Sequence, residues 1–403
     1  MDALMLPSNW QKVRLGDIAE IKRGASPRPI ENPKWFCANS NVGWVRISDI
    51  SKNSRFLYKT AQKLSKKGIE KSRFIKQNSL IMSMCATIGK PIITKIDTCI
   101  HDGFVVFENP KIDLNYLYYF LCYIEKEWLE SGQQGSQVNL NVDLIKNKEV
   151  FCPKDLNEQA AIANILSGLD HYLYSLRALI LKKEGVKKAL SFELLSQRKR
   201  LKGFTQAWQK VRLGDVATFL KGKGLSKSQV SPNAKHECIL YGELFTHYDR
   251  VVTNIKSFTN IYDNPMLSLN NDVLMPGSDV TPNGLATASC ILKKGVILGG
   301  DILIIRPNSN LLSGCFLAYC IVYDKNQVLS KVVGSTVYHL YAKDMKDFEI
   351  LLPPLNEQIA IANVLSDLDH EIISLKNKKR QFENIKKALN HDLMSAKIRV
   401  LKK

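Results

Sequence analysis

Two stretches of the chain carry apolar residues alternately four and three positions apart. In the first stretch these positions are Ile162, Leu166, Leu169, Leu173, Leu176 and Ile180. In the second they are Ile361, Leu365, Leu368, Ile372, Leu375, Phe382, Leu389 and Leu393, with Lys379 and Lys386 interrupting the series. Such spacing is typical of a coiled-coil seam. The pattern therefore predicts two helices of about 40 residues, each ~60 Å long.

These helical stretches belong to an internal repeat. WQKVRLGD at Trp10 to Asp17 returns unchanged at Trp208 to Asp215, and LNEQAAIANILSGLDHYLYSL from Leu156 matches LNEQIAIANVLSDLDHEIISL from Leu355. A repeat of this kind predicts two copies of one architectural unit. We therefore expect a globular domain and a helix, each twice, with the boundaries 1–155, 156–204, 205–354 and 355–403.

The short connection after the first helix restricts how the two helices can pair. Only about a dozen residues separate that helix from the second copy of the opening motif, so the second domain must lie at the helix's C-terminal end. The second helix can then pack along the first only by running back in the opposite direction. We expect an antiparallel coiled coil with a globular domain at each end and a pseudo-two-fold axis through its middle.

The globular segments have the pattern of short buried strands with a few helices, which predicts two α/β domains and an α+β fold class for the whole chain. NSLIMSMCATIGKPIIT in the first segment parallels NDVLMPGSDVTPNGLATASCIL in the second. In contrast, ISDISKNSRFLYKTAQKLS has no convincing counterpart near LFTHYDRVVTNIKSFTN. One scaffold with two different surfaces is the pattern expected of two related modules that read different ligands.

Composition narrows the class of partner and the compartment. The 403 residues carry a formal net charge of +19, which favours a polyanion such as nucleic acid, or an acidic protein. The nine cysteines form no C-x-x-C pair, which fits reduced thiols in a cytoplasmic protein. The opening residues lack a signal-peptide pattern and no run of 18 apolar residues occurs, so we expect a cytoplasmic chain without a membrane span.

A motif at the start of each helix resembles a known family. The pattern L-N-E-Q-x-x-I-A-x-x-L begins at Leu156, shortly after Pro153, and again at Leu355, directly after Pro354. It occurs together with LGD(I/V)A openings and with late Gly-Ser pairs at Gly135 and Gly334. This combination, in this order, resembles the specificity (S) subunit of type I restriction-modification systems. The resemblance covers the whole chain.

The resemblance implies a non-catalytic subunit of a larger complex. Each globular domain would read one half of a split site in double-stranded DNA, while the helices would act as a spacer and dock two modification (methyltransferase) subunits. Restriction subunits would complete an ATP-dependent nuclease. S-adenosylmethionine, ATP and magnesium would then belong to the partners, with no cofactor or metal in this chain.

The length of the helices sets an expectation for the spacing of the half-sites. Domains that face one side of B-DNA should contact it a whole turn apart, because each turn of about 10 base pairs spans ~34 Å. Two turns, ~68 Å, would exceed the ~60 Å helix. With half-sites of about 3 to 4 base pairs, the non-specific gap is about 5 to 8 base pairs.

Candidate DNA contacts lie in two kinds of loop in each domain. Arg, Lys, Asn and Gln can bond base edges in the major groove, and lysines hold phosphates. The early basic, glycine-flanked loops supply Lys22, Arg23, Lys221 and Lys223. The polar late loops supply Ser136, Gln137, Asn139, Asn141, Ser335, Tyr338 and His339. A tight turn without ligand contact remains the alternative, because turns favour Gly and Ser anyway.

Candidate partner contacts lie in the first turn of each helix. The helix pair is expected to expose Glu158 and Gln159 in one copy and Glu357 and Gln358 in the other, at matching positions. Two modification subunits could then bind with approximate two-fold symmetry. The repeat-equivalent pairs Asp170-His171 and Asp369-His370 are expected to serve helix packing or a subunit interface rather than a metal.

Searches for catalytic motifs find none. No Asn-Pro pair continues as N-P-P-[YFW], and KGKGLSKS lacks the spacing of a P-loop. Asp17, Glu20 and Lys22 resemble a nuclease triad, but the second copy has Thr218, Phe219 and Leu220 at and beside the matching positions. An autonomous restriction-methylation enzyme and a coiled-coil scaffold without DNA readout remain the alternatives to a recognition subunit.

Overall fold

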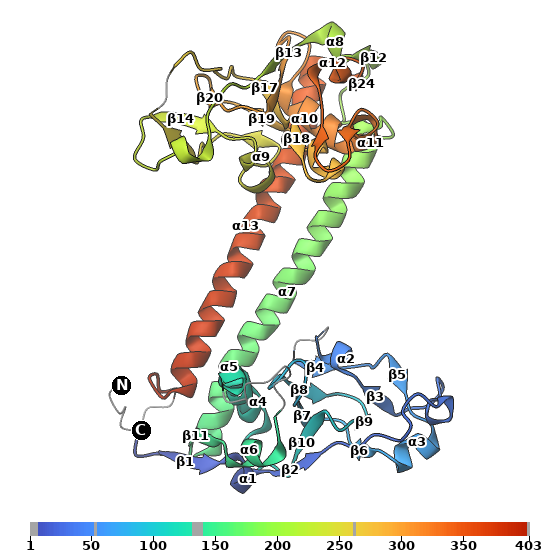
Figure 1. Ribbon diagram of the computed structural model, residues 1–403, viewed down its shortest axis with the longest axis vertical. Helices are drawn as coiled ribbons and strands as arrows, with labels where there is room; N and C mark the ends of the chain where they lie inside the picture. Colours follow the sequence, from blue (N-terminus) through green and yellow to red (C-terminus); the bar gives the residue numbers. More distant parts are fainter. Residues whose placement is uncertain (1–6, 52–54, 131–139, 261–262, 401–403) are drawn as a thin grey trace. The chain divides into compact units, whose positions relative to one another are not determined.

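The computed structural model describes residues 7–51, 55–130, 140–260 and 263–400. The chain divides into two compact units, Met1–Ser175 with Lys379–Lys403 and Leu176–Lys378. Each unit contains one globular domain and parts of two long helices, α7 (Leu156–Leu195) and α13 (Leu355–Met394) (Figure 1). Both helices have 40 residues, which confirms the predicted length. No described helix is both long and apolar enough for a membrane span.

The first domain is built on two sheets. The larger has the order β2 (Glu20–Arg23), β10 (Phe104–Glu108), β7 (Leu80–Ser83), β8 (Pro91–Thr94) and β4 (Phe56–Leu57). The smaller has the order β5 (Gln62–Lys63), β3 (Gly43–Val45), β9 (Thr98–Ile100) and β6 (Arg73–Ile75). A separate pair, β1 (Trp10–Arg14) with β11 (Glu149–Pro153), joins the beginning of the domain to its end. The short helices are α1 (Leu15–Ile18), η1 (Pro33–Trp35), α2 (Ile47–Ser51), α3 (Lys66–Glu70), α4 (Leu114–Tyr123), α5 (Glu125–Glu130) and α6 (Val142–Asn147).

The larger sheet of the first domain separates two hydrophobic cores. Because side chains alternate along a strand, Leu80 and Met82 face one core while Ile81 faces the other. The first core is closed by α4 and by the parts of α7 and α13 that belong to this unit, including Ile162 and Leu393. The domain and the helices therefore share one core within the unit.

The second domain repeats this plan. Its larger sheet has the order β13 (Ala217–Lys221), β21 (Ile302–Pro307), β17 (Asp272–Pro276), β19 (Ser289–Ile291) and β15 (Val251–Val252). Two smaller sheets have three strands each. One has the order β16 (Ser257–Thr259), β14 (His236–Ile239) and β20 (Ile297–Leu298), and the other has the order β18 (Ser278–Asp279), β23 (Tyr338–His339) and β22 (Val333–Gly334). The closing pair is β12 (Gln209–Arg212) with β24 (Glu349–Leu352). The helices are α8 (Leu213–Val216), η2 (Lys227–Gln229), α9 (Glu243–Thr246), η3 (Pro282–Ala286), α10 (Gly314–Tyr323), α11 (Lys325–Leu329) and α12 (Ala342–Met345).

The edge strands β4 and β15 correct one expectation from the sequence. Each is the parallel edge of its larger sheet, and each is preceded by an arginine whose carbonyl accepts a hydrogen bond from the neighbouring strand. Ile93 donates to Arg55 at 2.9 Å, and Cys290 donates to Arg250 at 2.8 Å. The segments that contain Arg55 and Arg250 are therefore counterparts, and the expectation that they lack one is wrong. Sheet pairing uses backbone groups, so the side chains around them could diverge.

The helix seams pack in antiparallel fashion inside each unit. In the first unit the rings of Tyr172 and Phe382 lie 4.6 Å apart, and Lys386 bonds Asp170. In the second unit Lys183 pairs with Glu371 at 2.8 Å, and Lys187 pairs with Asp369. In both units the contact positions rise along one helix as they fall along the other, which confirms the predicted direction. The predicted seam residues are buried or half-buried throughout.

Candidate nucleic-acid interface

The early basic loops occupy equivalent places in the two domains. Gly24 donates to the Phe104 carbonyl at 2.9 Å, and Gly222 donates to the Ile302 carbonyl at 2.8 Å. A Cβ added at Gly24 would lie 2.0 Å from the His101 carbonyl oxygen, and one at Gly222 would lie 1.9 Å from that of Gly299. Only glycine fits so close to another backbone. The glycines therefore fix where each strand leaves its sheet.

Of the cations expected in the early loops, Lys22, Arg23 and Lys221 lie in the strands β2 and β13, and only Lys223 follows its strand. The Lys22 ammonium is held by two carboxylates. It lies 2.6 Å from Glu108 and 2.9 Å from Glu20, and these hydrogen bonds, the one to Glu108 first, raise the pKa of Lys22. Arg23 is exposed and donates from Nε to the Asp102 carbonyl at 2.7 Å. Arg23 is thus better placed than Lys22 to reach a ligand.

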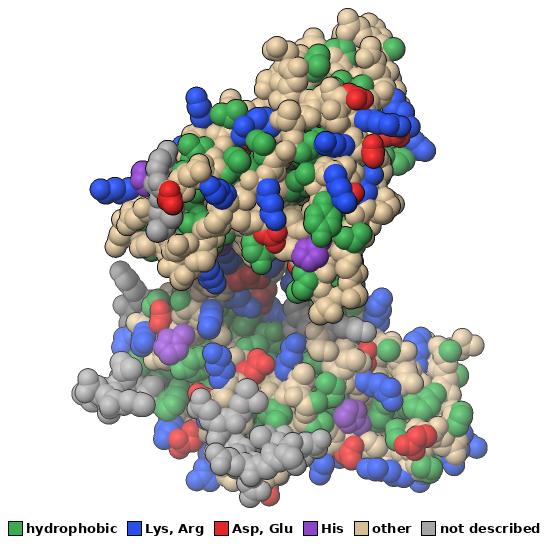
Figure 2. Space-filling view, turned by 45° about the horizontal axis from the view of Figure 1, so that its top comes forward, with side chains coloured by type: hydrophobic (Ala, Val, Ile, Leu, Met, Phe, Trp, Pro, Cys, Tyr) green, Lys and Arg blue, Asp and Glu red, His purple; other side chains and the backbone are tan. Residues whose placement is uncertain are grey.

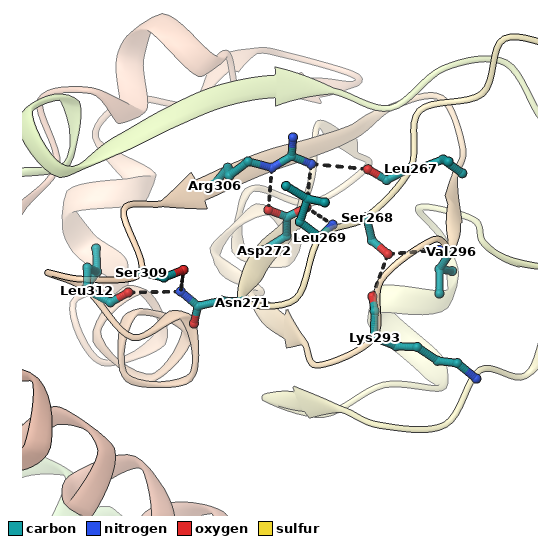
Figure 3. Close-up of polar contacts among 10 residues, drawn as sticks. All are labelled: Leu267, Ser268, Leu269, Asn271, Asp272, Lys293, Val296, Arg306, Ser309 and Leu312. Atoms are coloured by element: carbon teal, nitrogen blue, oxygen red, sulfur yellow. Dashed lines mark hydrogen bonds and ion pairs between the residues drawn. The ribbon is translucent and has the colours of Figure 1, made fainter.

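The second domain fixes a different cation at the matching edge. Arg306 occupies the position that matches Glu108, since it pairs with Thr218 as Glu108 pairs with Glu20, and it forms two bonds of 2.8 Å with the fully buried Asp272. Figure 3 shows this pair next to Leu267, Ser268 and Leu269. Hydrogen bonding to Asp272 raises the pKa of Arg306. Arg306 is therefore part of the framework of the second domain.

The second domain brings its early and late loops together. Lys221 lies 3.9 Å from Asp301, and Asp301 accepts a hydrogen bond from Ser278 in β18. The strand β18 pairs with β23, which carries Tyr338 and His339. Lys221 and the late hairpin are thus joined through Ser278 and Asp301, as one interface requires.

The late loop of the second domain is a β-hairpin. Strands β22 and β23 enclose the exposed residues Ser335, Thr336 and Val337. The ring of His339 stacks with that of Tyr341 at 6.2 Å, and Tyr338 packs on the domain core. Ser335 and His339 can therefore meet a ligand, whereas Tyr338 is partly committed to the core.

The late loop of the first domain is only partly described. Ser136, Gln137 and Asn139 lie outside the described residues. Asn141 caps α6, because its Oδ1 accepts the Leu144 backbone N–H at 2.8 Å. Leu140 donates to the Met84 carbonyl at 3.0 Å, so the end of this loop lies beside the strand end of β7. The structure thus gives Asn141 a structural role.

The expectation that the first helical turns expose Glu158, Gln159, Glu357 and Gln358 is wrong. All four side chains are at most 3% exposed. Gln159 accepts from Asp113 and donates to Pro153, while Gln358 accepts from Ser313 and donates to Pro353, all at 2.8 Å. Glu158 accepts from Asn9, and Glu357 accepts from Arg200 and Trp208. These residues fasten each domain to its helix, so a docking face must use other side chains.

A polar cluster at the junction of domain and helices was missed in the sequence. In the first unit, Asp170 accepts from Tyr119 at 2.7 Å and from Lys386, while Arg55 donates to Tyr119 at 3.0 Å. Arg55 is 6% exposed and also bonds Asn115 and Ser167. The cluster therefore links the edge strand, α4 and both long helices.

The second unit contains the same cluster at matching positions. Asp369 accepts from Tyr319 at 2.7 Å and from Lys187, and burial lowers the pKa of the nearby Arg250. Burial, and then the adjacent carboxylates, raise the pKa of Tyr119 and Tyr319, so both phenols remain donors. The two arginines could have been found as the residues directly before the edge strands. His171 and His370, in contrast, are exposed.

Among the described residues, no group of three or more His, Cys, Asp or Glu side chains is placed to hold a metal ion.

The space-filling view shows many Lys and Arg side chains, with fewer acidic ones, on the displayed face (Figure 2). One dense stretch of cations along the chain, the eight Lys and Arg residues from Arg55 to Lys76, was not singled out in the sequence. The sequence marks this stretch by its local density of Lys and Arg rather than by a motif.

Comparison with known proteins identifies the family. A family model described as "Type I restriction modification DNA specificity domain" matches residues 7–183 and again residues 205–384. The chain belongs to this family, with two copies of the domain in tandem.

Individual relatives extend over nearly the whole chain. The type I restriction enzyme MjaVIII specificity subunit of Methanocaldococcus jannaschii is 24% identical, covering 99% of this chain and 95% of the relative. The S subunit of a type I restriction-modification system from M. genitalium has a similar fold, with a TM-score of 0.65, 16% identity and coverage of 97% and 98%. A chain from a study of complex assembly and conformational transition of the type I R-M system gives a TM-score of 0.57, 16% identity and coverage of 96% and 98%.

Proposed function

We propose that this chain is the DNA sequence-recognition subunit of a type I restriction-modification complex, and that it binds a bipartite site. Each domain reads one half-site, and the gap between them is about 5 to 8 base pairs. The observation that carries the proposal is one scaffold used twice with different candidate interfaces. Identical readers would need identical surfaces, whereas these domains share their strand order and differ in their exposed polar groups.

Base readout is assigned to the edge where the early and late loops meet. In the second domain this edge presents Lys221, Lys223, Ser335 and His339, whose hydroxyl and nitrogen groups can bond base edges and phosphates. In the first domain Arg23 holds the matching position, and Ser136, Gln137 and Asn139 are proposed to supply the late loop. Guanine is the base that arginine recognises best, through O6 and N7.

Two modification subunits are proposed to dock on the long helices, and restriction subunits to join them. Apolar side chains that the helices leave exposed are proposed to take part in this docking. They are Ile165, Tyr174, Leu179, Leu181, Val186, Ile359 and Ile385. S-adenosylmethionine, ATP and magnesium are assigned to those partner subunits, and the role of this chain is to position them on DNA.

Sequencing of methylated bases in the host tests the proposal. A host that carries this gene should show a split methylated motif, and the motif should disappear when the gene is deleted. A motif that survives deletion would contradict the proposal. Incubation of the purified chain with DNA and S-adenosylmethionine tests the alternative of an autonomous enzyme, which alone predicts methylation without a partner.

A further inference from the structure

The two domains differ in charge after their equivalent edge strands. From Arg55 to Lys76 the first domain has eight Lys and Arg residues and a single acidic residue, Glu70. The matching 22 residues of the second domain, from Arg250 to Asn271, have only two Lys and Arg residues and one acidic residue, Asp263. Because both segments follow counterpart strands, the difference belongs to one region of a shared scaffold.

Most cations of the first segment are free to meet a ligand. Six of its lysines are exposed, and no ion pair involves them within the described parts of the chain. They are Lys59, Lys63, Lys66, Lys67, Lys71 and Lys76. Exposed cations without acidic partners repel one another, so binding an anion relieves a cost that the free protein carries.

Part of this segment is fixed against the early loop as a ridge. Ser72 donates to the Ala25 carbonyl at 2.7 Å, and Arg73 donates from Nε to the Arg23 carbonyl. Lys67 and Lys71 are four residues apart along and just beyond α3, so they project from the same side of the chain. We define Arg23, Lys67, Lys71 and Arg73 as the basic ridge.

The position of α3 is tightly determined. A Cβ added at Gly68 would lie 2.4 Å from the Trp35 carbonyl oxygen, so the helix packs directly on η1. Ser65 caps the helix by accepting from Gly68 at 3.2 Å and donates to the Lys34 carbonyl at 2.7 Å. The ridge therefore presents its charges from a preformed support, which reduces the entropy lost on binding.

We propose that the basic ridge binds the sugar-phosphate backbone of DNA beside the half-site read by the first domain, and that the second domain has no equivalent phosphate-binding surface. The proposal rests on the function proposed above, because it takes DNA as the ligand. DNA is favoured over an acidic protein because the ridge continues directly to the end of β2, which carries Arg23. Phosphate contacts there would set the register of the base-reading edge.

The proposal predicts a specific salt dependence. Each phosphate contact releases counterions and contributes about 0.9 to the slope of log affinity against log salt. Lys67→Gln with Lys71→Gln should therefore reduce the slope by about 2. The loss should be the same for specific and random duplexes, because phosphates carry no sequence information.

The test uses the full chain assembled with its modification subunits, and measures affinity over a salt series. The two probes are a random-sequence duplex and a duplex carrying the methylated motif. The control is Lys126→Gln with Lys146→Gln, which removes the same charge from exposed positions on α5 and α6. We expect the ridge variant to lower the slope on both probes and the control to leave it unchanged.

Three results would separate the possibilities. An unchanged slope in the ridge variant, or an equal fall in the control, would overturn the ridge. Weaker co-purification with the modification subunits at an unchanged slope would overturn it in favour of an acidic protein partner. A wild-type complex that binds the motif no better than random DNA would overturn the proposed function, while the slope on random DNA would still decide the ridge.

Discussion

The two units of this chain have the same contacts at the junction between domain and helices, but the surfaces of their domains differ. Both have the same order in the larger sheet and the same Tyr-Asp-Lys cluster, at Tyr119, Asp170 and Lys386 in the first unit. Beyond that junction the smaller sheets, the fixed ion pairs and the charge all differ. The junction therefore maintains the shared scaffold, while the surfaces of the two domains can differ.

Lengthening both helices should give the largest effect on function. Four residues inserted between Ser175 and Leu176, and four between Lys378 and Lys379, add ~6 Å and slightly more than one full turn to each helix. At 3.4 Å per base pair, the gap of the methylated motif should grow by about one or two base pairs. Both half-sites should stay as they are, because neither domain is touched.

The control places the same insertion after Lys294, in an exposed turn of the second domain. That variant should keep the original gap. A lengthened helix pair that also keeps it would show that the helices do not set the spacing.

Asp272→Asn should destabilise the second unit alone. Asp272 is fully buried and Arg306 partly exposed, so losing the carboxylate should cost about 2 to 4 kcal/mol, below the full figure for a wholly buried pair. Glu108→Gln in the first unit removes a more exposed pair and should cost less than ~1 kcal/mol. Hydrogen exchange read by mass spectrometry would locate each loss. Equal losses in both variants would contradict this difference between the units.

Removing the hydroxyl of Tyr119 or of Tyr319 in the junction clusters should cause a smaller loss of stability. Tyr319→Phe removes one hydrogen bond to Asp369 and should cost about 1 kcal/mol. Tyr119→Phe should cost about 2 kcal/mol, because it also removes an acceptor from Arg55. Chemical denaturation of the full chain measures both. A substitution without effect at either position would contradict a stabilising role for that phenol, and a larger loss for Tyr319→Phe than for Tyr119→Phe would contradict the role given to Arg55.

The smallest expected effect is a pH dependence confined to the first unit. Burial lowers the pKa of His101, whose Nδ1 accepts the Gly103 N–H at 2.9 Å. A histidine with a lowered folded pKa stabilises above its usual value of ~6.5, and this stability is lost as pH falls through the folded pKa. Hydrogen exchange in the first unit should therefore accelerate more below that pH in the wild type than in His101→Asn. Identical pH profiles would show that His101 does not cause the pH dependence of stability in the first unit.

The long helices could be predicted because their information is local and periodic. A seam repeated every 3.5 residues defines both the helix and the face that packs, and it identified positions such as Leu166 and Leu365 that are fully buried. Direction followed from the short connection between helix and domain.

The partner residues could not be predicted because their environment is not local. Glu158 and Glu357 are polar and start a helix, which locally indicates exposure. Their burial depends on Asn9, Arg200 and Trp208, which lie far away in the sequence and reach them only in the folded unit.

The DNA-binding predictions mix local and non-local information in the same way. The glycine-flanked loops were found because Gly24 and Gly222 mark close backbone approaches. That Lys22 is held by Glu108, whereas Lys223 is exposed, depends on strand pairing that no local pattern contains.

Exchange of the second domain tests whether each domain reads its half-site independently. Residues 205–354 are replaced by the equivalent domain of a relative, which leaves the first domain and both helices intact. Methylated bases are then sequenced in a host that carries the hybrid chain and its modification subunits. Independent reading predicts that one half-site changes while the other half-site and the gap remain. A hybrid that methylates with both half-sites altered would contradict independent reading by the two domains.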